Sequence, residues 1–253
     1  MFGVGKGKSS QLLSCWISDY GYSLVGIKEK RVLFYEERHS TEPSPMLIAK
    51  YLAEDVNKYH LVGCPCQVIL SHELYQLLLV DAPDVPEQEL FKALRWQLKG
   101  LVDYPLNNIT VDAFMVPSHG AGERRKKAFA AVILQSDLIN KISMIRSCLL
   151  NINAISISEL ALSKLLPPES TSLAFPSLVI SYEEELCRHH VYYKENLYFF
   201  RTLPMNKAVI QSNSTAYQNM LLEIQRSIDY CLMELKLPEP KQIFFSPSFY
   251  QAS

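Results

Sequence analysis

The chain has 253 residues, with 25 basic and 26 acidic side chains and a formal net charge of −1 at pH 7. This near-neutral charge argues against nucleic acid as a partner, and 48% apolar residues exclude a disordered chain. No run approaches the ~18 consecutive apolar residues of a membrane-spanning helix, and the first ten residues lack a secretory signal. We therefore expect a cytoplasmic globular protein with reduced cysteines.

The first half of the chain shows strand periodicity and then helical periodicity. Strands are predicted at 12–18, 22–28, 31–38, 67–70 and 75–80, with a helix after the prolines at 43 and 45. Segment 86–101 has the strongest helical period. Leucines 90, 94, 98 and 101 fall on its core face, and its opposite face carries Lys92, Arg95 and Lys99 beside Trp96.

The second half repeats this texture beyond a Pro- and Ser-rich boundary at 167–176. Before this boundary, the remaining predicted elements are strands at 110–116 and 128–134, helix 137–150, strand 154–157 and helix 158–166; beyond it they are strands at 178–182, 187–193 and 197–203, helix 217–235 and strand 241–245. The last helix is expected to bury Leu221, Ile224 and Ile228. Both halves thus begin with three strands and a helix, which predicts an α/β fold of two related halves.

Three motifs resemble functional sites, but each has a simpler structural explanation. Residues 2–9 imitate a P-loop, yet Phe2 replaces the first glycine and no strand precedes it, so a basic arm is favoured. The other two are a possible metal cluster and a possible nucleophile group: His60, Cys64, Cys66 and His72; and Cys187, His189 and His190. Neither has the spacing or the orienting group of a known site, so core positions are favoured.

Two basic surfaces have open interpretations. The run 124–127 is either a solvated hairpin tip or a contact for anionic lipid headgroups. The face of the 86–101 helix that carries Arg95, Trp96 and Lys99 either packs on a neighbouring subdomain or docks a partner, because an exposed tryptophan is otherwise unusual.

Segment 75–117 resembles the PilM-type actin-like proteins of type IV pilus assembly, and most closely their MshI-type members from mannose-sensitive haemagglutinin (MSHA) pili. The matching residues are Asp81-Ala82-Pro83, Glu89-Leu90, Ala93, Arg95-Trp96, Leu98-Lys99, Tyr104-Pro105-Leu106 and Val111-Asp112. Residues 222–230, LEIQRSIDY, resemble a second family segment, and 158–162 a helix opening. The resemblance covers the chain from about residue 12 onward.

The resemblance implies an actin-like, ribonuclease H-like α/β fold with two lobes. It implies an arm at 1–10, a first lobe at 11–166 with an inserted subdomain at about 80–135, and a reduced second lobe at 173–253. It also implies a cytoplasmic scaffold at the inner membrane that docks the tail of a PilN-type membrane protein, and possible recruitment of the assembly ATPase. The expected docking residues are Arg95, Trp96, Lys99, Tyr104 and Pro105.

The nucleotide site implied by the family is where this sequence departs. The first phosphate turn retains Asp19, Gly21 and Ser23, but the second has no glycine and carries three carboxylates at 183–185. We therefore expect a scaffold that is not an enzyme and has no cofactor. The alternatives are an actin-like ATPase that binds Mg·ATP, and the cytoplasmic part of a type II secretion platform protein.

Overall fold

The computed structural model describes residues 12–29, 31–118, 126–164, 166, 174–182, 186–205 and 214–246. The chain forms two compact units. Unit 1 comprises Met1–Phe114 and Phe129–Ser158, and unit 2 comprises Met115–Ala128 and Glu159–Ser253. The predicted arm at 1–10, Arg124 and Arg125, and the carboxylates at 183–185 lie outside the described residues. Among the residues described, no helix is long and apolar enough to cross a membrane.

Unit 1 is built on a five-stranded sheet in the order β3-β2-β1-β4-β8. Its strands are β1 (Leu12–Ile17), β2 (Gly21–Lys28), β3 (Arg31–His39), β4 (Pro65–Leu70) and β8 (Asn151–Ile157). The first three form an antiparallel meander, whereas β1, β4 and β8 run parallel. Parallel neighbours need crossover connections, and helices supply them here.

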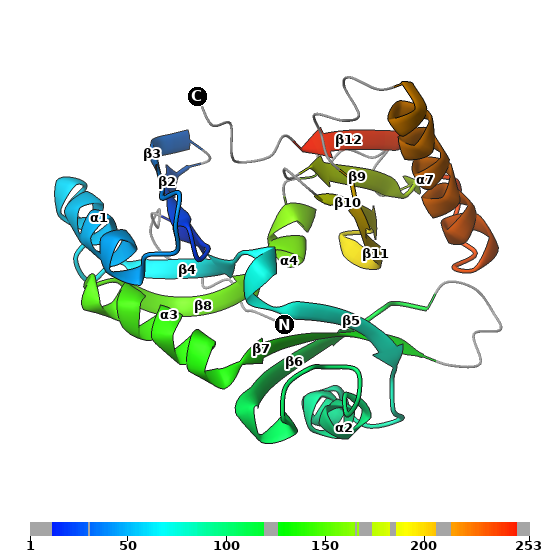
Figure 1. The fold of residues 1–253 in the computed structure, drawn as a ribbon, viewed down its shortest axis with the longest axis horizontal. Coiled ribbons are helices and arrows are strands. Elements are labelled where there is room, and N and C mark those ends of the chain that lie inside the picture. Colours follow the sequence, from blue (N-terminus) through cyan, green and yellow to red (C-terminus); the bar gives the residue numbers. More distant parts are fainter. Residues whose placement is uncertain are drawn as a thin grey trace. The chain divides into compact units, whose positions relative to one another are not determined.

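Helices α1 (Pro45–Lys58) and α3 (Gln135–Ser147) lie side by side in Figure 1 and pack with the five-stranded sheet. Pro45 at the start of α1 suits a first helical turn, because proline lacks the N–H that would be unpaired there. Their apolar faces join inward-facing residues of β1, β2 and β4 in one buried core. This core holds the β1–β2 turn and α3 in fixed positions.

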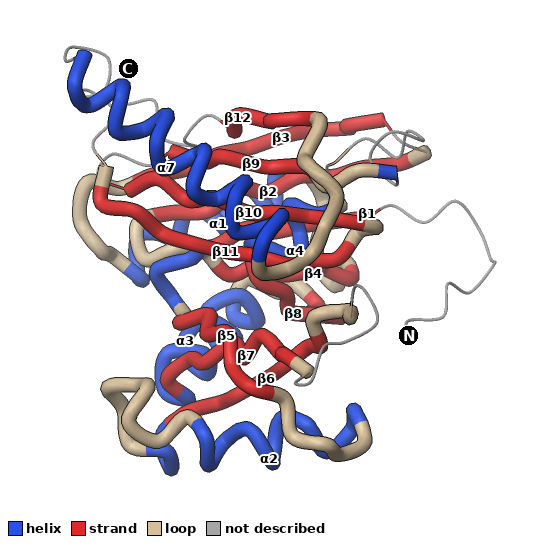
Figure 2. Tube along the Cα trace, turned by 90° about the vertical axis from the view of Figure 1, so that its right-hand side faces the viewer, coloured by secondary structure: helices blue, strands red, loops and turns tan. Residues whose placement is uncertain are grey.

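A second sheet in unit 1 forms the inserted part, in the order β5-β7-β6. Its strands are β5 (Gln76–Asp81), β6 (Ile109–Met115) and β7 (Lys127–Leu134), and the ends of β6 and β7 belong to unit 2. Helix α2 (Leu90–Gln97) lies next to this sheet in both views (Figures 1 and 2). It buries Leu90, Leu94 and Leu98, as its periodicity predicts.

Unit 2 contains a four-stranded sheet in the order β11-β10-β9-β12. Its strands are β9 (Ser177–Tyr182), β10 (Leu186–Tyr193), β11 (Asn196–Pro204) and β12 (Gln242–Ser246), with helices α4 (Ser158–Ser163) and α7 (Ser214–Met233). Strands β9–β11 are antiparallel and β12 runs parallel to β9. This is the order of the first four strands of unit 1, so the predicted relation between the halves is confirmed.

The predicted elements are confirmed with small changes of boundary, but two leucines predicted to be buried, Leu101 and Leu221, are exposed. The helix predicted to reach residue 101 ends at Gln97, and Gly100 has a φ of +82°, so Leu101 is exposed. Helix α3 ends at Ser147, and the left-handed Leu149 beyond it is also exposed. In α7 the buried stripe runs through Met220, Ile224, Ser227 and Cys231, so Leu221 is exposed.

Candidate functional site

The turn between β1 and β2 corresponds to the predicted first phosphate turn, and its four N–H groups already have acceptors. The Ser18 N–H donates to the Gly21 carbonyl at 3.0 Å. The N–H groups of Tyr20 and Gly21 both donate to Ser18 Oγ, at 3.0 and 2.8 Å. The Asp19 N–H points to Glu73 Oε1 at 3.4 Å. A phosphate would have to displace these internal acceptors to use the turn.

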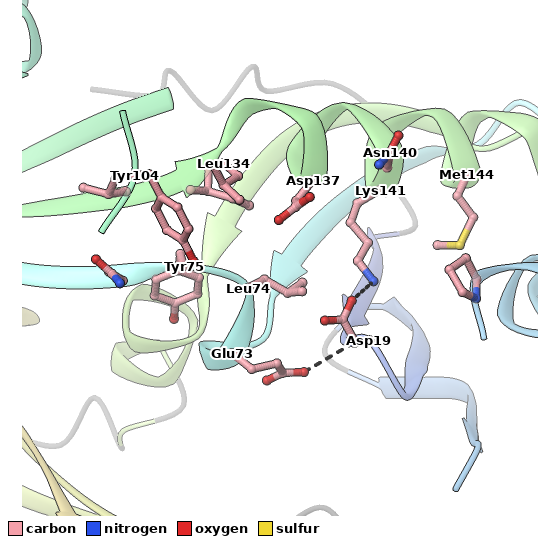
Figure 3. Close-up of a pocket in the computed structure, with 14 residues that line it drawn as sticks. Asp19, Glu73, Leu74, Tyr75, Tyr104, Leu134, Asp137, Asn140, Lys141 and Met144 are labelled. Carbon is pink, nitrogen blue, oxygen red and sulfur yellow. Dashed lines mark hydrogen bonds and ion pairs between the residues drawn. The ribbon is translucent and has the colours of Figure 1, made fainter. Parts of the chain in front are cut away.

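Asp19 is held by a lysine from a distant helix (Figure 3). Lys141 Nζ lies 2.7 Å from Asp19 Oδ1 and also donates to the Ser18 carbonyl at 2.7 Å. The Lys141 side chain is only 9% exposed, whereas the Asp19 side chain is 48% exposed. Lys141 thus fixes the turn to α3, and the Asp19 carboxylate remains half exposed to solvent.

The other two predicted phosphate-turn residues have packing roles. A Cβ on Gly21 would lie 2.1 Å from the Arg38 carbonyl of β3, so glycine is required by the close approach of that strand. Ser23 is buried within β2, opposite Trp16 and Glu37 in the neighbouring strands. The turn therefore brings together Asp19, Lys141 and Glu73.

A cavity of about 350 Å³ lies within unit 1, where the β1–β2 turn and α3 meet the inserted part. In Figure 3, Tyr75 and Tyr104 lie at one end, Asp19 and Lys141 lie further along the lining, and Met144 lies beyond them. Leu74, Leu134 and Met144 supply apolar walls. Asp19, Glu73 and Asp137 place three carboxylates on the lining against one lysine. The cavity thus has an apolar, aromatic end and an acidic end.

The five expected docking residues do not form one surface at this cavity. Only Tyr104, which is 37% exposed, lines it. Arg95 Nε donates to the Leu106 carbonyl at 3.1 Å, and its Nη2 contacts the same oxygen, so Arg95 holds the loop after α2. Trp96 is 76% exposed. Lys99 and Pro105 are exposed in the same loop region and lie outside the cavity lining.

The remaining sequence motifs lie in buried or scattered positions. Within the part of the chain that is described, no group of three or more His, Cys, Asp or Glu side chains could hold a metal ion, and this includes His60, Cys64, Cys66 and His72. Burial raises the pKa of the Cys66 thiol to about 12 and that of Cys187 to about 11. Such thiols are protonated and poor nucleophiles at neutral pH.

His189 and His190 are both fully buried in β10, because both faces of this strand are covered. His189 Nδ1 lies 2.8 Å from Ser227 Oγ on α7. Burial, with a smaller contribution from the nearby Arg201 guanidinium, lowers the pKa of His189 to about 4. The histidine is therefore neutral at physiological pH and belongs to the core of unit 2.

No known family model matches the sequence, and no curated protein matches it. Solved structures do match. A chain of the PilM–PilN type IV pilus biogenesis complex has a TM-score of 0.71 at 14% identity, over 95% of this chain and 82% of that chain. The fold is actin-like. The cytoplasmic domain of EpsL, an inner-membrane component of the Vibrio cholerae type II secretion system, gives 0.57 at 12% identity, over 95% and 91%.

Two residues that contact the first turn were not predicted from the sequence. Lys141 and Glu73 contact the turn from α3 and from the 3₁₀ helix η1 (His72–Leu74), which are remote in sequence. The only local signal was the spacing of Lys141 four residues before Ile145, which places both on one helix face, and these two are the buried residues of α3. Pairing it with Asp19 requires the tertiary structure.

Proposed function

We infer that this protein is a cytoplasmic actin-like scaffold of a type IV pilus, of the MshI type, and that it docks the short tail of a PilN-type inner-membrane protein. The observation that carries this proposal is the cavity in unit 1 between α3 and the inserted part. Similarity to a chain of the PilM–PilN complex supports the class of partner. The similarity to EpsL supports a type II secretion platform as the second candidate.

The cavity suits an extended peptide better than a compact ligand. One end offers Tyr75, Tyr104 and apolar side chains for an apolar residue, and the other offers Asp19 and Glu73. Anchor residues in such sites are commonly aromatic. Tyr104 is therefore the docking residue that we favour, with Arg95 positioning its loop through Leu106.

Substitutions of residues that line the cavity should weaken binding of the PilN-type tail. A synthetic peptide of the PilN-type partner's cytoplasmic tail is titrated into the protein and followed by fluorescence anisotropy. We expect Tyr104→Ala and Met144→Glu each to lower the affinity about tenfold or more, which corresponds to about 1.4 kcal/mol.

Trp96→Ala is the matched control, because it removes an aromatic side chain of the same inserted part that lies outside the cavity lining. Unchanged binding by Tyr104→Ala together with a loss in Trp96→Ala would move the docking site to α2. Unchanged binding by all three variants would reject both surfaces.

The protein is proposed to act without nucleotide hydrolysis. Internal acceptors occupy the N–H groups of residues 18–21, and the Glu73 carboxylate lies where it would repel a phosphate. The sequence of the second turn, with glutamates at 183–185, adds to this support.

Calorimetric titration with Mg·ATP tests this directly. We expect no saturable heat at up to about 1 mM nucleotide, where binding would still represent about 4 kcal/mol. Circular dichroism of the same sample establishes that it is folded. A saturable isotherm that Asp19→Ala abolishes would overturn the scaffold proposal in favour of a nucleotide-dependent switch.

A further inference from the structure

Helix α2 presents an aromatic and basic face that the proposed tail docking does not use. Trp96 is 76% exposed at its centre. Lys92 lies one turn before it on the helix, and Lys99 follows just beyond the end of the helix at Gln97; both are exposed. We call these three residues the α2 face.

Helix α2 is packed on its opposite side, so the α2 face is exposed on a helix that is held in place. Leu90, Leu94 and Leu98 are buried on the opposite side. Arg95 closes the end of the helix by hydrogen bonding to the Leu106 carbonyl. The helix lies outside the three-stranded sheet in both views (Figures 1 and 2).

The composition of this face favours a lipid surface over a protein surface. Lysine is depleted in protein–protein interfaces, where arginine is enriched. Tryptophan with flanking lysines is typical of helices that lie at the membrane–water interface, with the indole among the headgroups and the amines on anionic lipids. Phe91, 40% exposed, adds apolar area beside Lys92, whose Nζ lies 5.8 Å from the centre of the Phe91 ring. The acidic residues nearest in sequence, Glu89 and Asp103, lie beyond the two ends of α2.

We propose that the α2 face binds the surface of an anionic phospholipid bilayer directly, with Trp96 inserted among the headgroups and Lys92 and Lys99 contacting lipid phosphates. This contact is separate from tail docking. It rests on the proposed function in one respect, which is that the docked tail of a membrane protein holds unit 1 near the bilayer. Each basic residue near an anionic surface contributes about fivefold in affinity. The contact is therefore weak alone and acts as a second anchor.

The test uses the purified full chain and phosphatidylglycerol-containing vesicles without any partner protein. A failure to bind these vesicles can therefore be distinguished from a failure of tail docking. Trp16→Phe leaves Trp96 as the sole tryptophan, because the chain has two. We expect its emission to shift to shorter wavelength as lipid is raised to about 1 mM, a range that detects binding as weak as one myristoyl chain provides. Vesicles of phosphatidylcholine alone should give little shift.

Co-sedimentation with the same vesicles tests which residues make the contact. These variants are made in the chain that retains Trp16. The double variant Lys92→Glu/Lys99→Glu should reduce binding more than tenfold, and Trp96→Ala should reduce it severalfold. Lys50→Glu/Arg146→Glu makes the same charge change at exposed positions on α1 and α3 and should bind as the unaltered chain does. No binding to anionic vesicles, or equal losses in both double variants, would overturn the proposal.

Discussion

Asp55→Ala is expected to lower the free energy of unfolding by about 3 kcal/mol. Asp55 lies on α1 and is 1% exposed. Its Oδ2 accepts a hydrogen bond from the Tyr22 hydroxyl at 2.6 Å, and its Oδ1 accepts one from Arg38 Nη2 at 3.2 Å. One carboxylate thus ties β2 and β3 to α1, next to the strand approach that requires Gly21.

The expected size of this loss follows from what the alanine leaves behind. The Tyr22 hydroxyl would be buried without its acceptor, which is costly in an apolar core. Burial, together with the hydrogen bond to Asp55, raises the pKa of Tyr22, so the phenol remains a donor at all ordinary pH values. Arg38 is 41% exposed and can be hydrated, so the expected loss of stability lies at the lower end of the range for breaking a buried ion pair.

Urea denaturation followed by circular dichroism measures this difference. Asp55→Asn keeps an acceptor for Tyr22 and should cost less than the alanine. Glu54→Ala, on the exposed side of the same helix, should change stability by no more than about 0.5 kcal/mol. A loss below about 1 kcal/mol for Asp55→Ala would show that water satisfies both partners and that this tie contributes little.

The second large effect is a loss of stability on acidification that originates at His189. Ser227 Oγ donates to the Glu223 carbonyl at 2.9 Å, so the hydroxyl accepts from His189 Nδ1. The other ring nitrogen, Nε2, is buried and has no hydrogen-bond partner among the residues that the structure describes. A proton added there would have no acceptor, and the Arg201 guanidinium would repel it.

The sign follows from the lowered pKa. Burial lowers the pKa of His189 from 6.5 to about 4, so between these values the unfolded chain binds the proton and the folded chain does not. Stability therefore rises with pH across this window and is lost as pH falls from 6.5 towards 4. The full loss is about 3 kcal/mol.

Unfolding midpoints measured in urea at several pH values between 4 and 7 test this expectation. His189→Gln, which has no titrating group, should show a shallower dependence of stability on pH in this window. Parallel profiles for the variant and the unaltered chain would assign the acid sensitivity to other groups.

Local periodicity was enough to predict most of the fold. The strands β1, β2 and β3 and the helix α7 were placed within a few residues, because alternation and helical spacing are properties of neighbouring residues. The helices predicted to reach residues 101 and 150 end earlier, close to a left-handed residue, Gly100 in one case and Leu149 in the other. Periodicity continues through such a stop, because the apolar pattern does not record the change of backbone conformation.

The candidate site depended much more on tertiary structure. Asp19 and Gly21 were recognisable as parts of a phosphate turn, but their actual partners, Lys141 and the Arg38 carbonyl, come from other elements. The cavity combines the turn, α3 and Tyr104 of the inserted part. Such combinations depend on which strands pair and which helices pack, and chain spacing does not encode them directly.

The sequence by itself determined the α/β class, the two related halves and the placement of Trp96 with Lys92 and Lys99 on the polar side of the 86–101 helix. These features follow from hydrophobic pattern, which acts within a few residues. The tertiary structure decided that Glu73 and Ser18 take the N–H groups of the first turn, that Lys141 holds Asp19, and that Tyr104 lines a cavity which Trp96 does not. Those outcomes arise from contacts between distant segments, which only the packed chain brings together.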